Sequence, residues 1–234
     1  MAPLGSSGID VSQIILGCGN FGGVGSTPAF FGRGESREEA FTVLDAAWEA
    51  GITTFDTADA YGGGRSESWI GDWLATKGQE VRGRIVLSTK TFNPMDEGED
   101  HGLAPARVRR QLESSLRRLG VERVDMYLTH AWDSDVPVAE TLGVFGELVA
   151  AGKVGAVGAS NVDGAQLREA LDASAARAGS RCSGRRGPTM TAVTRGSASS
   201  HASARAAGVV PRSRAAAARP SRPRQTESSS SRWR

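Results

Sequence analysis

Four residues whose side chains can act together in catalysis lie at or just after short apolar runs: Asp56, Tyr61, Lys90 and His130. Asp56 follows "GITTF", and Tyr61 comes five positions later. Lys90 ends the run "IVLSTK", and His130 ends "VDMYLTH". The set comprises a carboxylate, a phenol, an amine and an imidazole. Gathered in one place, such groups can move a proton.

The phenol would be the proton donor of this set. A phenol ionises near pH ~10 and is a poor acid at neutral pH, but an ammonium group beside it favours the phenolate. A buried ammonium needs a counter-charge, which Asp56 can supply. The imidazole of His130 can hydrogen-bond a carbonyl oxygen and aim it at the phenol. The set therefore predicts carbonyl reduction by hydride transfer. The sequence shows no metal-ligand pattern, so we expect an organic cofactor to supply the hydride.

Five apolar runs rich in β-branched residues are expected to be the strands that position these groups. Their hydrophobicity is nearly continuous, as a strand buried on both faces requires. The runs cover 14–19, 52–57, 85–90, 124–130 and 154–160.

Amphipathic helix patterns separate these runs. In "SREEAFTVLDAAWEAG", Ser36 is the expected N-cap, Glu38 and Glu39 lie in the first turn, and Gly51 marks the end. Further patterns cover 66–78, 104–120, 138–152 and 162–171, and a small hairpin is expected over 3–12.

This alternation predicts an α/β fold of the (β/α)8 TIM-barrel type, incomplete, with about five of the eight strands. In such a barrel the active site lies at the carboxyl ends of the strands, where the four residues fall.

The alternation stops near residue 173. Residues 181–234 contain 12 Arg and one Glu, a net charge of +11, whereas residues 1–180 contain 25 acids and 16 bases, a net charge of −9. The last 54 residues have no Leu, Ile, Phe or Tyr, so they cannot bury enough apolar surface to offset chain entropy. We predict a partial barrel domain over 1–175 and a disordered, low-complexity basic tail over 176–234.

Taken together, the motifs resemble the aldo-keto reductase family. The resemblance rests on "GITTFDTADAYGGGRSE", "IVLSTK", "RRQLESSLRRLGVERVDMYLTHAWD" and "GKVGAVGASN", and it covers roughly residues 1–172. It implies a catalytic tetrad in which Tyr61 is the general acid and Lys90 lowers the pKa of Tyr61. In this tetrad Asp56 is the partner of Lys90, and His130 orients the substrate.

The resemblance also implies a nicotinamide cofactor, NADPH or less often NADH. Ser160 and Asn161 match the residues that hold the nicotinamide carboxamide, and Gly19 and Asn20 match a position whose backbone approaches the cofactor. Asp56 is included in the same cofactor-binding set. Trp132 lies in the loop after the fourth strand and is a candidate for lining the substrate pocket. The alternative is that Trp132 is an aromatic loop residue without a functional role.

Each residue also has a purely structural interpretation. "DTADAY" alone is typical of a helix-entry turn, Lys90 alone of a surface amine, and His130 alone of an interior histidine. Ser160–Asn161 alone would cap the following helix. The agreement of separate strand ends favours the catalytic interpretation. The glycine run after Tyr61 lacks the Gly-Lys-Ser/Thr ending of a phosphate loop, so we interpret it as a flexible hinge.

The sequence departs from the family after "GASN". The resemblance implies a sixth strand with a Gln, then a Tyr that stacks on the nicotinamide, and a basic loop that grips the adenosine phosphate. None of these is found in the sequence. Five parallel strands cannot close a barrel, so we expect marginal stability and weak or absent NADPH binding. A change of reading frame near residue 180 is one hypothesis, which resequencing of the gene would test.

The leading expectation is an NADP-dependent oxidoreductase that reduces aldehydes or ketones, with inactivity of this truncated chain as an open alternative. The alternatives are a non-enzymatic, cofactor-binding regulatory subunit and a frameshifted fragment without function. The basic tail would bind nucleic acid only in a sequence-blind manner, so no specific nucleic-acid partner is expected.

Targeting signals are not evident in the sequence. No run is long enough to span a bilayer, no secretory signal opens the chain, and Cys18 and Cys182 form neither a disulfide nor a metal pattern. We therefore expect a cytoplasmic protein, without a membrane partner, that acts on a small-molecule carbonyl substrate.

Overall fold

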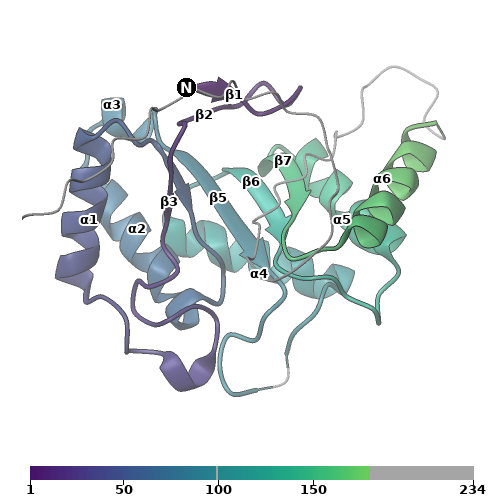
Figure 1. Cartoon of the computed structure of the whole chain (residues 1–234), viewed down its shortest axis with the longest axis horizontal. Helices are drawn as coiled ribbons and strands as arrows, with labels where there is room; N and C mark the ends of the chain where they lie inside the picture. Colours follow the sequence, from purple (N-terminus) through teal and green to yellow (C-terminus); the bar gives the residue numbers. More distant parts are fainter. Residues whose placement is uncertain (99, 180–234) are drawn as a thin grey trace, which may run out of the picture. The chain divides into compact units, whose positions relative to one another are not determined.

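The computed structural model of the chain describes residues 1–98 and 100–179. The predicted tail therefore lies outside the described residues, apart from its first four positions. The described residues form a parallel sheet of five strands in the order β3-β4-β5-β6-β7, and a separate antiparallel pair, β1-β2. Figure 1 shows the helices following one another around one side of the sheet.

The strands are β1 (Ala2–Pro3), β2 (Asp10–Val11), β3 (Ile15–Gly17), β4 (Thr54–Asp56), β5 (Val86–Thr91), β6 (Val124–Thr129) and β7 (Val154–Ala159). The α-helices are α1 (Arg37–Glu49), α2 (Arg65–Thr76), α3 (Gln79–Arg82), α4 (Pro105–Leu119), α5 (Val138–Ala150) and α6 (Gly164–Gly179), and the 3-10 helices are η1 (Pro28–Phe30) and η2 (Tyr61–Gly64).

The predicted alternation of parallel strands and helices is confirmed. Each of the five expected strands forms, and so does the N-terminal hairpin. Ser36 caps α1 in a capping box with Glu39, because the Ser36 side chain accepts from the Glu39 amide and the Glu39 carboxylate accepts from the Ser36 amide. Helix α3 and the two 3-10 helices were not predicted. They are too short to show a hydrophobic period.

The main hydrophobic core lies between the sheet and the helices. Phe55 of β4 meets Trp73 of α2 with ring centroids 5.6 Å apart, and Tyr127 of β6 meets Phe145 of α5 at 5.4 Å. The other face of the sheet carries a smaller apolar cluster, made of Ile9, Met126, Leu128 and Ala156. Side chains alternate between the two faces along a strand, so Asp56 points away from the core that Phe55 enters.

Strands β3 and β7 are the two edges of the sheet in the described part of the chain. Beside the β3 edge, Ile14 and Ile15 expose 67% and 43% of their surface. An exposed apolar edge of this kind invites pairing with other chains. Within the described ranges, no helix combines the length and the hydrophobicity that crossing a membrane requires.

The glycine run after Tyr61 is a close-packed left-handed loop. Gly62, Gly63 and Gly64 have φ angles of 58°, 67° and 91°, a region in which other residues are strained. A Cβ atom on Gly62 would lie 2.6 Å from the carbonyl oxygen of Phe21. Gly62 and Gly64 are buried. The interpretation of this run as a flexible hinge is therefore wrong, because its glycines are needed for backbone conformation and close packing.

Replacing Gly62 with Ala is expected to lower the free energy of unfolding by more than about 2 kcal/mol, because the left-handed backbone and the clash with Phe21 both oppose a side chain. Gly152→Ala is the matched control, since Gly152 has a φ of 75° and open space where the Cβ would lie. This control should cost only about 1 kcal/mol. Urea unfolding of both variants measures the difference, and equal losses would show that the close packing of Gly62 is unimportant.

Candidate active site

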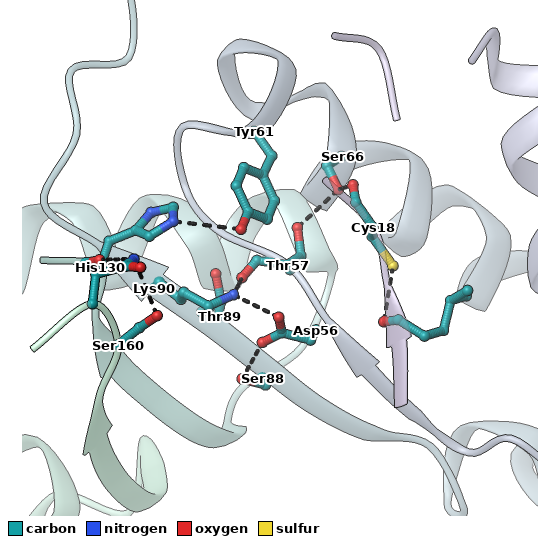
Figure 2. A network of polar contacts seen from close by, with 12 residues as sticks. Cys18, Asp56, Thr57, Tyr61, Ser66, Ser88, Thr89, Lys90, His130 and Ser160 are labelled. Carbon is teal, nitrogen blue, oxygen red and sulfur yellow. Dashed lines mark hydrogen bonds and ion pairs between the residues drawn. The ribbon is translucent and has the colours of Figure 1, made fainter. Parts of the chain in front are cut away.

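Four neighbouring strands deliver polar side chains to one edge of the sheet. Asp56 ends β4, Lys90 lies near the end of β5, His130 follows β6 and Ser160 follows β7. The strands are parallel and in register, with Asp56 opposite Ser88 and Lys90 opposite Leu128, so their carboxyl ends meet. Figure 2 shows these side chains gathered near Tyr61, with dashed lines from the Tyr61 hydroxyl to His130 and from Lys90 to Asp56.

The Lys90 amine is held firmly in a buried position. Its Nζ donates to Asp56 Oδ2 at 2.7 Å and to the Thr57 carbonyl oxygen at 2.8 Å. The Lys90 side chain is only 3% exposed, which excludes the surface-amine interpretation. Burying this ammonium is costly unless it is paired and hydrogen-bonded, and Asp56 and Thr57 meet that requirement.

The Tyr61 phenol lies between the amine and the imidazole. Lys90 Nζ is 5.2 Å from the centroid of the Tyr61 ring, and the Tyr61 hydroxyl is 3.4 Å from His130 Nε2. The two rings meet edge to face at an interplanar angle of 79°. Tyr61 and His130 are 7% and 8% exposed, so little solvent reaches either ring. The structure thus brings together all four residues of the predicted tetrad.

Ser160 and Asn161 lie beside this group. Asn161 Nδ2 donates to the His130 carbonyl oxygen at 2.7 Å and to Ser160 Oγ at 3.2 Å, which ties the ends of β6 and β7 together. Asn161 has a left-handed φ of 53°, which asparagine tolerates better than most residues. Helix α6 is capped by Asp163, whose Oδ1 accepts from the amides of Ala165 and Gln166 at 2.8 Å. The capping interpretation of Ser160–Asn161 is therefore wrong.

Gly19 and Asn20 follow β3 on the other side of the tyrosine. A Cβ atom on Gly19 would lie 3.7 Å from the Tyr61 ring, so Gly19 adjoins the site. Asn20 is exposed, and its carbonyl oxygen accepts from the Glu35 amide at 2.9 Å. Their role in cofactor binding stays a prediction.

A recess of about 210 Å³ opens beside these groups, on the face of the sheet opposite the helices. Its polar lining is Asp56, Ser88, Lys90 and Ser160, and its apolar lining includes Met126 and Leu128. Trp132 lines a different cavity, together with Val138, Phe145 and Leu167, and no tetrad residue borders that cavity. The assignment of Trp132 to the substrate pocket stays a prediction.

Three residues that support the tetrad were not predicted from the sequence. Ser88 Oγ donates to Asp56 Oδ1 at 2.9 Å, the Thr57 carbonyl holds Lys90, and Asn93 Nδ2 lies 3.0 Å from His130 Nδ1. Ser88 was detectable, because it lies two residues before Lys90 on the same face of β5. The Thr57 contact uses the backbone, and Asn93 lies in a loop, so neither leaves a pattern in the sequence.

Comparison with known proteins places these features in a family. The family model described as "Aldo/keto reductase family" matches residues 13–180. The "Uncharacterized oxidoreductase YrpG" of Bacillus subtilis is 36% identical over 176 residues, which cover 71% of this chain and 51% of that protein. The "NADH-specific methylglyoxal reductase" of Escherichia coli is 35% identical over 184 residues, which cover 72% of this chain and 54% of that protein.

A solved structure shows the same fold. The glycerol dehydrogenase AKR11B4 from Gluconobacter oxydans superposes with a TM-score of 0.57 and 29% sequence identity, over 70% of this chain and 49% of that one. The present chain thus spans about half the length of the relatives it matches. The likeness confirms the predicted α/β fold of the TIM-barrel type with five parallel strands. Since the family model matches well over half of its residues, the chain belongs to the aldo/keto reductase family.

Proposed function

We propose that this chain carries the proton-donating site of an NADPH-dependent reductase of aldehydes and ketones, with Tyr61 as the general acid. The observation that supports the proposal best is the position of the Lys90 amine. It is fixed by Asp56 Oδ2 at 2.7 Å and by the Thr57 carbonyl at 2.8 Å, and it faces the Tyr61 ring. A cation fixed beside a phenol favours the phenolate and so eases release of the proton.

Each residue of the tetrad then has a distinct task. Tyr61 donates its hydroxyl proton to the substrate oxygen as that oxygen gains negative charge. Lys90 stabilises the phenolate that is left, and Asp56 holds the Lys90 amine in place. His130, whose Nε2 lies 3.4 Å from the Tyr61 hydroxyl, orients the carbonyl oxygen toward that hydroxyl. Asn93 keeps the His130 ring in position from the Nδ1 side.

The residues beside the tetrad fit the carboxamide end of a nicotinamide. A carboxamide both donates and accepts hydrogen bonds. The Ser160 hydroxyl can donate to it, and the exposed Asn161 side chain offers an amide oxygen as acceptor. When bound, the cofactor supplies the hydride. The choice of NADPH over NADH comes from the family resemblance. The Escherichia coli relative is named as NADH-specific, so both cofactors need to be tested.

No contact in the described residues favours the regulatory-subunit or the frameshift alternative. The proposed carbonyl substrate and the cytoplasmic location also follow from the family resemblance and the sequence.

Tyr61→Phe should lower the rate of NADPH-dependent aldehyde reduction by roughly 100-fold or more, because the general acid is lost. The rate is measured where it is proportional to cofactor concentration, so weak cofactor binding affects both proteins equally. Tyr127→Phe is the matched control, since Tyr127 is the other of the two tyrosines and its hydroxyl donates to Val108 in the helix-side core at 3.3 Å. A Tyr61→Phe protein as active as wild type would contradict the assignment.

NADPH should bind this chain only weakly, without saturation in the micromolar range, because the sequence lacks the stacking tyrosine and the basic loop that the family resemblance implies. The enhancement of nicotinamide fluorescence on titration, with NADPH and NADH in parallel, measures this binding. Asn161→Ala should weaken it further if the carboxamide lies where we propose. Saturation at micromolar NADPH would contradict the prediction of weak binding. An unchanged affinity in Asn161→Ala would contradict the proposed place of the carboxamide.

A further inference from the structure

A second group of charged side chains lies on the helix-facing side of the sheet, behind the tetrad. Thr89 and Thr91 alternate with Lys90 along β5, so they point toward the helices while Lys90 points into the site. Asp59, in the turn between β4 and η2, faces Thr91 together with Glu67 of α2 and with Arg107 and Arg118 of α4, and it also faces Tyr127 of β6. Both Asp59 and Glu67 are fully buried.

Asp59 is unusual because neither of its carboxyl oxygens makes a hydrogen bond of ordinary length within the described residues, although the Thr91 hydroxyl is near enough to favour the ionised form. Its charged neighbours are engaged elsewhere. Glu67 accepts from Thr89 Oγ1 at 2.5 Å and from Arg118 Nε at 2.7 Å. The Arg107 guanidinium donates to Thr91 Oγ1 and to the carbonyl oxygens of Asn93, Asp100 and Gly102. An ionised carboxylate in such a place would be desolvated with only the Thr91 hydroxyl as a nearby donor, which is strongly unfavourable.

The neutral form of Asp59 suits this environment. Burial, followed by the negative charge of Glu67, raises the pKa of Asp59 from 3.8 to about 7. The Thr91 hydroxyl, followed by the positive charges of Arg107 and Arg118, opposes this shift without cancelling it. A neutral carboxylic acid in this position carries no charge that needs solvation.

The backbone of Asp59 connects this buried carboxyl to the tetrad. The Asp59 amide donates to the Lys90 carbonyl oxygen at 2.9 Å, while the Thr57 carbonyl accepts from the Lys90 amine at 2.8 Å. Two residues later, the Tyr61 amide donates to the Ala58 carbonyl at 3.2 Å. The turn 57–61 is therefore attached to Lys90 at two points and carries Tyr61 at its end. Asp59 lies at the centre of this turn.

We propose that Asp59 is a positioning residue of this site: as a neutral acid it keeps the turn 57–61 closed on Lys90, and its ionisation opens the turn and displaces Tyr61. The effect on catalysis rests on the proposed function, whereas the effect on the turn does not.

The direction of the pH effect follows from linkage. In the open turn Asp59 is solvated and has its ordinary pKa of 3.8, whereas in the closed turn the pKa is about 7. The stability that neutral Asp59 gives the closed turn is therefore fully present below about pH 4 and is lost as the pH rises to about 7. Above that pH, Asp59 is ionised in both forms. Between about pH 5 and about pH 8, the ratio of open to closed turn should rise by more than roughly tenfold.

Hydrogen exchange of the amides in 57–61 tests this inference, at about pH 5 and about pH 8, with each rate corrected for the intrinsic pH dependence of exchange. In wild type, the protection of these amides should fall by more than roughly tenfold across this range. In Asp59→Asn, which keeps the shape and cannot ionise, it should change by less than about twofold. Asp59→Leu, an apolar replacement of similar size, serves in its place if the Asn variant does not fold.

Asp72→Asn is the control for loss of a carboxylate as such, because the Asp72 side chain is 52% exposed on α2 and pairs with Arg37. Its exchange should follow that of wild type. Turnover gives the second measurement: between the same pH values, the kcat/KM of wild type should fall relative to that of Asp59→Asn.

The possible results separate the two proposals. Protection that falls equally in wild type and Asp59→Asn, or in neither, overturns the role of Asp59 and leaves the proposed function intact. A fall confined to wild type, with parallel turnover profiles in the two proteins, also overturns the positioning role, because the turn would then open without affecting the site. A fall confined to wild type, with turnover that does not depend on Tyr61, supports the role of Asp59 in the turn and refutes the proposed function.

Discussion

The site depends on one interaction, the burial of the Lys90 ammonium against Asp56. A charge that is 3% exposed stays in place only if its surroundings supply hydrogen-bond acceptors, here Asp56 Oδ2 and the Thr57 carbonyl. Meeting that need fixes the end of β4 against β5 and so fixes the turn that leads to Tyr61. The requirement of a buried amine for acceptors thus brings the phenol to its place beside His130.

Much of this arrangement could be predicted from the sequence, because it follows from periodicity. Strands buried on both faces and amphipathic helices alternate, and parallel strands bring their carboxyl ends together, so Asp56, Lys90 and His130 had to meet. The glycine run was misread, since a left-handed, close-packed loop and a flexible hinge share the same composition. The contact of the Thr57 carbonyl involves no side chain and could not have been found in the sequence.

The two faces of β5 have different roles at the same point of the strand. Lys90 points into the recess, whereas Thr89 and Thr91 meet the buried groups Glu67 and Arg107 behind the sheet. Polar residues on the helix-facing side of a sheet are unexpected, because that side forms the main hydrophobic core. Sequence periodicity assigns the positions of Thr89 and Thr91 to the hydrophobic core. Asp59 lies in a turn and Glu67 in the first turn of α2, so no sequence pattern indicates that their carboxyl groups are buried there.

The central claim is that the Lys90 amine makes the Tyr61 phenol a better acid, and the ultraviolet absorbance of phenolate measures this directly. The chain has two tyrosines, and burial, followed by the charge of Asp59, raises the pKa of Tyr127 well above its ordinary value. A phenolate signal that Tyr61→Phe removes therefore belongs to Tyr61. With Asp59→Asn present in both proteins, so that Asp59 cannot ionise and open the turn, this signal should shift to higher pH in the Asp56→Asn, Lys90→Met double variant, which removes the cation without stranding its partner. An unchanged titration would contradict the central claim.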